Sequence, residues 1–242
     1  MSPALPDVHQ LSRAAVVVPP SNPVVEPELA ALLGPGTALY GSRLPRYADF
    51  ALEQRNRFYV RAYAAALDAL AGLQVQAALI AMTGPNYRFG LEGDKALCDD
   101  LTQRFGAPVA TASLAIYESL TAMGADRITL LSPYPDWLTA EAQQYWTGAG
   151  FTVDTVHQFF TSGQDFRAYE TDSEQVVDAL ESFQSDVPAV LTGTGLATIN
   201  SLQQASGDNM VMSSNLCGAW WLLRQLGLAG SPGYRSVSAF LA

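Results

Sequence analysis

Cysteine and histidine are scarce in this sequence, which has two of each in 242 residues. The cysteines, Cys98 and Cys217, are too few for a disulfide framework, and neither CxxC nor Cys/His zinc spacing occurs. The histidines, His9 and His157, are too few for a histidine-based metal site. The sequence therefore predicts a fold stabilised by its apolar core, with no metal and no disulfide.

Charged residues make up only 15% of the chain, and basic residues are the rarer kind, with 13 Lys and Arg against 23 Asp and Glu. The net charge of −10 makes nucleic acid and an anionic membrane poor partners. This charge says little about a small anionic substrate, because a pocket sets its own local field. Hydrophobic residues reach 49%, which is typical of a buried α/β protein.

Long apolar runs are absent, and no stretch reaches the length that spans a membrane. Residues 1–13 lack a basic region followed by an apolar one, so they do not resemble a signal peptide. We therefore expect a soluble, cytoplasmic protein without a membrane partner.

Short β-rich runs alternate with runs of helical periodicity, which indicates parallel sheets covered by helices on both faces. Strands are predicted at residues 14–19, 76–82, 108–111, 127–133, 189–193 and 209–214. Helices are predicted at residues 26–34, 54–73, 94–106, 113–125, 137–150, 173–184 and 217–228. Ligands of such sheets bind outside the carboxyl ends of the strands, where this chain carries small polar residues and glycine.

Two stretches repeat one pattern of an apolar strand that ends in a Thr-Gly pair. "ALIAMTGPN" spans residues 78–86, and "AVLTGTGLA" spans residues 189–197. "VVVPPSN" and "ITLLSPY" correspond in the same way. An internal duplication with a boundary near residue 112 would place the two turns on opposite sides of one cleft. The alternative is chance similarity between strands of an α/β protein.

These stretches, with "VVVPPSNPVVEPEL", "SPYPDW" and "MSSNLCGAWWLLRQLGL", resemble the aspartate/glutamate racemase superfamily. The most similar branch is that of maleate cis-trans isomerase and arylmalonate decarboxylase, over residues 15–233. The resemblance implies two pseudo-symmetric flavodoxin-like lobes with parallel sheets and a cofactor-free site in the cleft between them. We place the N-terminal lobe at residues 14–112 plus 214–233 and the C-terminal lobe at residues 113–213.

The family's cysteines are the main departure. Its racemases and isomerases use two cysteines, one from each lobe, and the decarboxylase keeps only the second. These positions fall here on Met82 and Gly193, which cannot act as acid, base or thiolate. Cys98 is interpreted as a buried mid-helix thiol. Cys217, near the start of the last helix, is a less favoured candidate nucleophile, because a helix N-terminus can lower the pKa of a thiol.

The first strand is followed by Ser21 and Asn22, which we predict to bind substrate. Asn22 matches the asparagine that the isomerase branch uses on a substrate carboxylate, although it is also a common turn residue before proline. Arg88 could pair with a second carboxylate. A surface position is the other interpretation of Arg88.

The resemblance assigns the remaining site to the two Thr-Gly turns and one tyrosine. Thr83 and Tyr134 match the hydroxyl-bearing positions of the family and, with Thr194, are the predicted catalytic residues. Gly84, where the family usually has serine, and Gly195 would contribute backbone N–H groups to bind substrate. Strand ends, helix caps and a packing tyrosine are the alternative interpretations.

The predicted function is a cofactor-free lyase or isomerase that acts on a small mono- or dicarboxylate through an enediolate-like carbanion held by an oxyanion hole. Decarboxylation is favoured, because loss of CO₂ needs only one proton donor, either Tyr134 or water. The alternative is a binding or regulatory homologue that has lost catalysis with the cysteine pair. A homo-oligomer is compatible with the resemblance.

Overall fold

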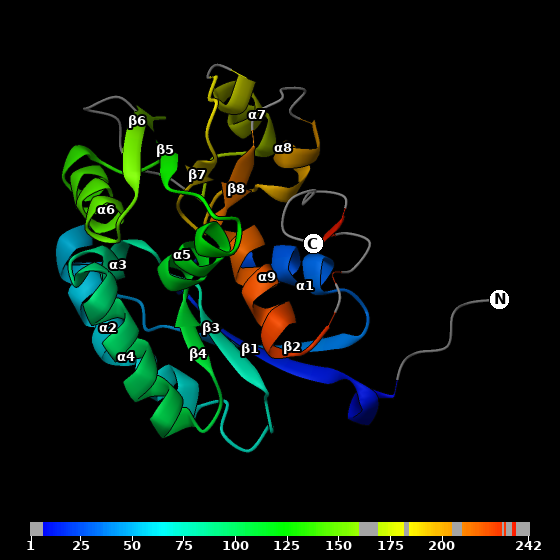
Figure 1. Ribbon diagram of the computed structural model, residues 1–242. Helices are drawn as coiled ribbons and strands as arrows, with labels where there is room; N and C mark the ends of the chain where they lie inside the picture. The colour runs from blue at the N-terminus through cyan, green and yellow to red at the C-terminus, as the bar shows by residue number, and fades with distance from the viewer. Residues whose placement is uncertain are drawn as a thin grey trace.

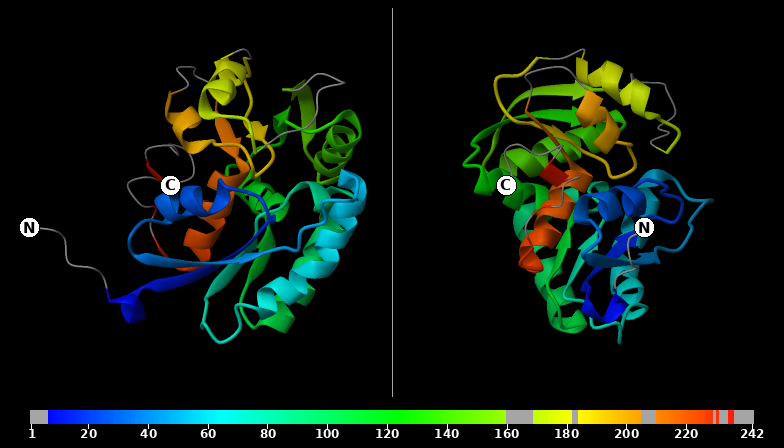
Figure 2. Two further views of the ribbon diagram at one scale, coloured as in Figure 1. Left: turned by 180° about the vertical axis from the view of Figure 1, so that it is seen from behind. Right: turned by 90° about the vertical axis from the view of Figure 1, so that its right-hand side faces the viewer.

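The structure is a computed structural model that describes residues 7–159, 169–181, 184–204, 210–228, 230 and 234–235. Its strands form two four-stranded parallel sheets that lie one above the other (Figure 1, Figure 2). The predicted α/β class with two parallel sheets is confirmed. None of the helices in these residues is both long and apolar enough to cross a membrane.

The first sheet has the strand order β2-β1-β3-β4. Its strands are β1 (Ser12–Val18), β2 (Thr37–Arg43), β3 (Ala77–Ile80) and β4 (Val109–Thr111). The helices of this part are α1 (Val25–Leu33), α2 (Leu52–Asp68), the short α3 (Gly84–Tyr87), α4 (Gly90–Phe105) and α5 (Ala112–Ala122), after a 3-10 turn at Val8–Gln10.

The second sheet repeats this topology with the order β6-β5-β7-β8. Its strands are β5 (Arg127–Ser132), β6 (Thr152–Gln158), β7 (Ala189–Leu191) and β8 (Val211–Ser213). Its helices are α6 (Asp136–Gly148), α7 (Ser173–Glu181), α8 (Ile199–Gln204) and α9 (Ser214–Gln225).

The last strand of each sheet runs directly into a helix through a capping hydroxyl. Thr111 Oγ1 accepts a hydrogen bond from the N–H of Leu114, and Ser213 Oγ accepts one from the N–H of Leu216, both at 3.1 Å. Such N-caps satisfy backbone donors that the first helical turn leaves free. The helices that they start, α5 and α9, pack against each other at the centre of the molecule (Figure 1).

Helix α9 connects the two sheets, because it contacts β3 and α1 of the first part as well as β8 of the second. It is buried along most of its length. A Cβ at Gly218 would lie 2.6 Å from Leu79 Cδ2, so a larger residue would force this buried side chain of β3 to move. Helix α9 thereby joins both sheets through one apolar core.

Two of the four edge strands, β2 and β6, were not predicted, whereas the buried edge strands β4 and β8 were. Strands β2 and β6 each pair on one side only and are partly exposed, so neither has the continuous apolar run of a central strand. Residues 182–183 of a predicted helix and residue 209 of a predicted strand lie outside the described residues. The same holds for residues 229 and 231–233 of the predicted N-terminal lobe and for residues 160–168 and 205–208 of the predicted C-terminal lobe. The lobe boundaries stay a prediction.

Candidate active site

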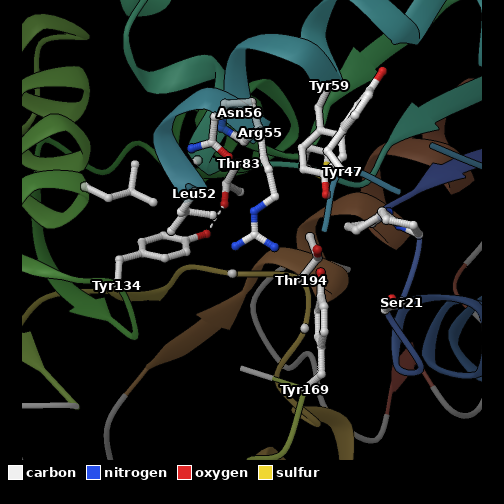
Figure 3. A pocket seen from close by; sticks show the side chains of 18 of the residues that line it. Ser21, Tyr47, Leu52, Arg55, Asn56, Tyr59, Thr83, Tyr134, Tyr169 and Thr194 are labelled. Atoms are coloured by element: carbon white, nitrogen blue, oxygen red, sulfur yellow. Dashed lines mark hydrogen bonds between the residues drawn. The ribbon is translucent and has the colours of Figure 1, made fainter. Parts of the chain in front are cut away.

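A cavity of about 430 Å³ lies at the carboxyl ends of the strands of both sheets. Its lining comes from the segments after β1, β2, β3, β5 and β7, from one face of α2 and from residues 169–170 (Figure 3). The predicted site residues that line it are Ser21, Met82, Thr83, Gly84, Tyr134, Gly193, Thr194 and Gly195. The topology therefore brings together residues that are up to 174 positions apart in the sequence, counted from Ser21 to Gly195.

A pair of hydroxyls joins the two halves of the cavity. Thr83 Oγ1 follows β3 and is hydrogen-bonded to Tyr134 Oη, which follows β5 (Figure 3). Both side chains are buried. Burial raises the pKa of Tyr134 to about 12, although hydrogen bonds from Thr83 and from the Gly84 backbone oppose the rise. The phenol therefore keeps its proton in the neutral range and can donate to an oxyanion.

The turn after β7 is fixed by its own hydroxyl. Thr194 Oγ1 donates to Ala81 O at 2.8 Å, which connects the turn to the end of β3. The proton of this hydroxyl is thus already used within the protein. Among the described residues, the backbone N–H groups of Gly193, Thr194 and Gly195 have no hydrogen-bond partner. The turn therefore offers backbone donors to a ligand, whereas the threonine side chain holds the turn in place.

Asn22 lies behind this turn and does not line the cavity. Its Oδ1 accepts hydrogen bonds from the N–H groups of Val24 and Val25 at 2.8 and 3.2 Å, at the start of α1. Its Nδ2 donates to the carbonyl and the hydroxyl of Thr194 at 3.2 and 3.3 Å. The side chain is 1% exposed and its polar atoms are satisfied. The predicted contact with a substrate carboxylate is therefore corrected to a role in positioning the turn.

Glu28 supports the segment after the same turn. It lies on α1 and is 9% exposed, and it accepts hydrogen bonds from the N–H groups of Thr198 and Ile199, the latter at 2.8 Å. Asn215 Nδ2 donates to Glu28 Oε2 at 2.7 Å and to the Thr194 carbonyl at 3.2 Å. Burial raises the pKa of Glu28, and these donors oppose the rise. One carboxylate thus connects α1, α8 and α9 behind the cavity.

No thiol lines the cavity in the part of the chain that the structure describes. Cys98 is buried in α4, as predicted, and burial raises the pKa of its thiol to about 12. Cys217 is fully buried in α9. Burial raises the pKa of its thiol to about 12, although a side-chain hydrogen bond with Ser119 opposes the rise. This position disfavours Cys217 as a nucleophile, because it is neither at the cavity nor acidified by the helix N-terminus.

Met82 and Gly193 do line the cavity, where the resemblance places the family's cysteines. Gly193 has a φ of +94°, which side chains of L-residues rarely adopt. A Cβ there would lie 3.1 Å from Pro133 Cγ and 3.4 Å from Tyr134 Oη. At Gly84, which replaces the family's serine, a Cβ would lie 3.2 Å from Leu138 Cδ2. The backbone at Gly193 therefore disfavours a side chain, whereas a side chain at Gly84 would require Leu138 to shift slightly.

We expect Gly193→Ala to lower the free energy of unfolding by about 1–3 kcal/mol, because the methyl group combines a disfavoured backbone with crowding. Gly150→Ala is the matched control, since Gly150 has a φ of +97° but no neighbour within 4 Å of its Cβ position. Urea unfolding of both variants measures the difference. Equal losses in the two variants would contradict crowding against Pro133 and Tyr134.

Helix α2 supplies a side of the cavity that sequence reasoning missed. Leu52, Arg55, Asn56 and Tyr59 lie at i, i+3, i+4 and i+7, so they share one helix face, and all four line the cavity. The sequence predicted a helix at residues 54–73 from its periodicity, but it did not show that one face of this helix lines a site. Arg88, the arginine that was considered, is exposed and lines an adjoining cavity with Glu53, Arg57 and Glu141, which shares Asn56 and Gly84 with the main one.

Comparison with known proteins agrees with this geometry. The model of the family described as arylmalonate decarboxylase matches residues 14–237. A maleate isomerase of Nocardia farcinica is 28% identical over 242 residues, which is 90% of this chain and 91% of the relative.

Two solved structures share the fold. The maleate isomerase Iso of Pseudomonas putida S16 superposes with a TM-score of 0.84 at 19% identity, over 95% of this chain and 99% of that one. A cysteine-to-serine mutant of the Nocardia farcinica maleate cis-trans isomerase, with a covalently bound succinylcysteine intermediate, has a TM-score of 0.80 at 22% identity over 92% and 96%. The family match covers most of the sequence, and the chain therefore belongs to the arylmalonate decarboxylase family, a family of enzymes in the predicted branch of the aspartate/glutamate racemase superfamily.

Proposed function

We propose that this protein is a cofactor-free lyase that decarboxylates a small malonate-like dicarboxylate through an enediolate held at the Thr83–Tyr134 pair. The observation that carries the proposal is a buried tyrosine hydroxyl, hydrogen-bonded to a threonine hydroxyl, in a cavity without a thiol among the described residues. Hydroxyl and backbone N–H donors of this kind stabilise negative charge as it develops on a carboxylate.

The proposed reaction needs only the substrate, water and the hydroxyl and N–H donors of the cavity. The bond from the α-carbon to the leaving carboxylate breaks and CO₂ departs, while its electron pair stays on the α-carbon and delocalises into the retained carboxylate as an enediolate. Tyr134 Oη and the N–H groups of the turn after β7 are suited to bind the retained carboxylate. A proton from water, or from Tyr134 with later reprotonation by water, completes the monocarboxylate product.

Apolar side chains favour the loss of CO₂. Leu52, Met82, Pro85 and Leu138 line the cavity beside the hydroxyl pair. A carboxylate placed against them is poorly solvated, whereas neutral CO₂ is not penalised there. Maleate isomerisation is less favoured, since a relative of that activity carries a succinylcysteine intermediate and no thiol of the described residues reaches this cavity.

The test is incubation of the purified protein in D₂O with aspartate, glutamate, maleate, hydantoins and aryl- and alkylmalonates, followed by proton NMR. We expect malonates to lose CO₂ and their products to gain deuterium at the α-carbon. Exchange or conversion of aspartate, glutamate or maleate, without turnover of any malonate, would overturn the decarboxylase proposal.

A second candidate function is a carboxylate-binding homologue without catalysis. It is favoured by the side chains at the two cysteine positions, because neither Met82 nor Gly193 can transfer a proton. Line broadening of the malonates by the protein, without turnover of any compound, would favour this candidate.

A further inference from the structure

Arg55 projects its guanidinium group into the cavity, on the side where Tyr134 and Thr194 lie (Figure 3). It lies in the first turn of α2, which begins at Leu52, on the helix face that lines the cavity. Arg88, the cation that the sequence offered as a partner for a substrate carboxylate, does not line this cavity. Arg55 therefore places a cation beside the hydroxyls and backbone N–H groups of the site.

Within the described part of the chain, no carboxylate forms an ion pair with Arg55. Its Nε is buried and has no hydrogen-bond partner in the same part of the chain. A half-buried guanidinium with an unsatisfied donor is costly unless a ligand completes it.

A buried tyrosine of the cavity lies within reach of this charge. Burial raises the pKa of Tyr59, and the positive charge of Arg55 opposes the rise. The cavity lining also includes Arg46 and Glu170, of which Arg46 is exposed. The arginine charge is thus directed at a region lined by tyrosine hydroxyls.

We propose that Arg55 binds a carboxylate on the substituent of the substrate's α-carbon, so that the site selects substrates with an acidic side chain. The inference rests on the proposed function for the group held at Thr83 and Tyr134. A planar guanidinium can form two parallel hydrogen bonds to a carboxylate, which is the recognition that a buried Nε donor suits.

The leaving carboxylate is a poorer partner for Arg55. An ion pair with that group would stabilise the substrate and would be lost as CO₂ forms, which raises the barrier. A carboxylate on the substituent keeps its charge throughout the reaction. Binding it to Arg55 orients the substrate without opposing the bond that breaks.

Binding of two unreactive acids tests the inference independently of catalysis. Isothermal titration calorimetry would compare succinate with butyrate, which has a methyl group in place of one carboxylate. We expect wild-type protein to bind succinate about 10- to 100-fold more tightly, since a hydrogen-bonded charge pair contributes that much. Arg55→Gln should abolish this preference, and Arg55→Lys should restore part of it.

Arg61→Gln is the matched control, because Arg61 is an exposed arginine on the same helix and its loss changes the net charge equally. It should keep the succinate preference. Equal binding of both acids by wild-type protein, no detectable binding of either, or an unchanged preference in Arg55→Gln would each overturn the inference.

Turnover separates this inference from the proposed function. Carboxymethylmalonate and ethylmalonate would yield succinate and butyrate, so they form the matched pair of substrates. A succinate preference that depends on Arg55, without turnover of any malonate, would sustain the inference and reject the decarboxylase. Turnover of ethylmalonate and carboxymethylmalonate at equal kcat/KM, unaffected by Arg55→Gln, would sustain the decarboxylase and reject the inference.

Discussion

Replacing Tyr134 by phenylalanine is expected to slow decarboxylation of the best malonate about 100- to 1000-fold, the usual effect of removing one oxyanion-hole donor. The phenol would contact the retained carboxylate most strongly when the enediolate carries its full charge. We therefore expect kcat and kcat/KM to fall together, since an interaction made mainly in the transition state affects both. Initial rates from proton NMR measure the change.

The pH profile gives a second test of the same residue. Burial raises the pKa of Tyr134 to about 12, so its hydroxyl stays protonated until the pH approaches that value. If the rate depends on this proton, deprotonation of Tyr134 should not lower the rate between about pH 6 and 10.

Tyr117→Phe is the matched control, because Tyr117 lies on α5 and does not line the cavity. Phenylalanine keeps the aromatic ring that Lys95 contacts. Tyr134→Phe with a rate within about threefold of wild type would remove the tyrosine from the oxyanion hole.

The central strands of the fold could be predicted because burial on both faces leaves a clear pattern. β1, β3, β5 and β7 lie inside their sheets and read as continuous apolar runs. The edge strands β2 and β6 are partly exposed, and their sequences, such as "TALYGSR" in β2, contain no continuous apolar run. These two segments form strands because they pair with a neighbouring strand, and the pattern of a single sequence does not show that pairing.

The candidate site was predictable where it follows strand ends and unpredictable where it depends on which way a side chain points. Thr83 and Tyr134 were found through the resemblance, and the topology brings them into contact. Asn22 was predicted to bind the substrate, but it lies next to the start of α1, where both its Oδ1 and its Nδ2 form hydrogen bonds within the protein. Arg55 and Arg88 are alike in the sequence, and only helix phase and tertiary packing direct Arg55 to the cavity.

Replacing Glu28 by alanine is expected to lower the free energy of unfolding by about 3–5 kcal/mol, because it leaves several buried donors without an acceptor. The N–H groups of Thr198 and Ile199 and the amide of Asn215 lose their shared carboxylate. Glu26→Ala is the matched control two residues earlier on α1, where the glutamate forms a partly exposed ion pair with Arg43. Such a surface pair contributes about 0–1 kcal/mol, so urea unfolding should separate the two variants clearly.

Glu28→Gln tests the charge of this carboxylate by its pH dependence. Burial raises the folded-state pKa of Glu28 above the ordinary value near 4.5, so the folded protein binds this proton more tightly than the unfolded chain does. The contribution of Glu28 to the free energy of unfolding is therefore full below that value and declines as the pH rises through the folded-state pKa. The stability of wild-type protein relative to Glu28→Gln should fall across that window. A relative stability that rises with pH there would mean that the hydrogen bonds from Thr198, Ile199 and Asn215 outweigh desolvation, and that α1 holds the β7 turn through an ionised carboxylate.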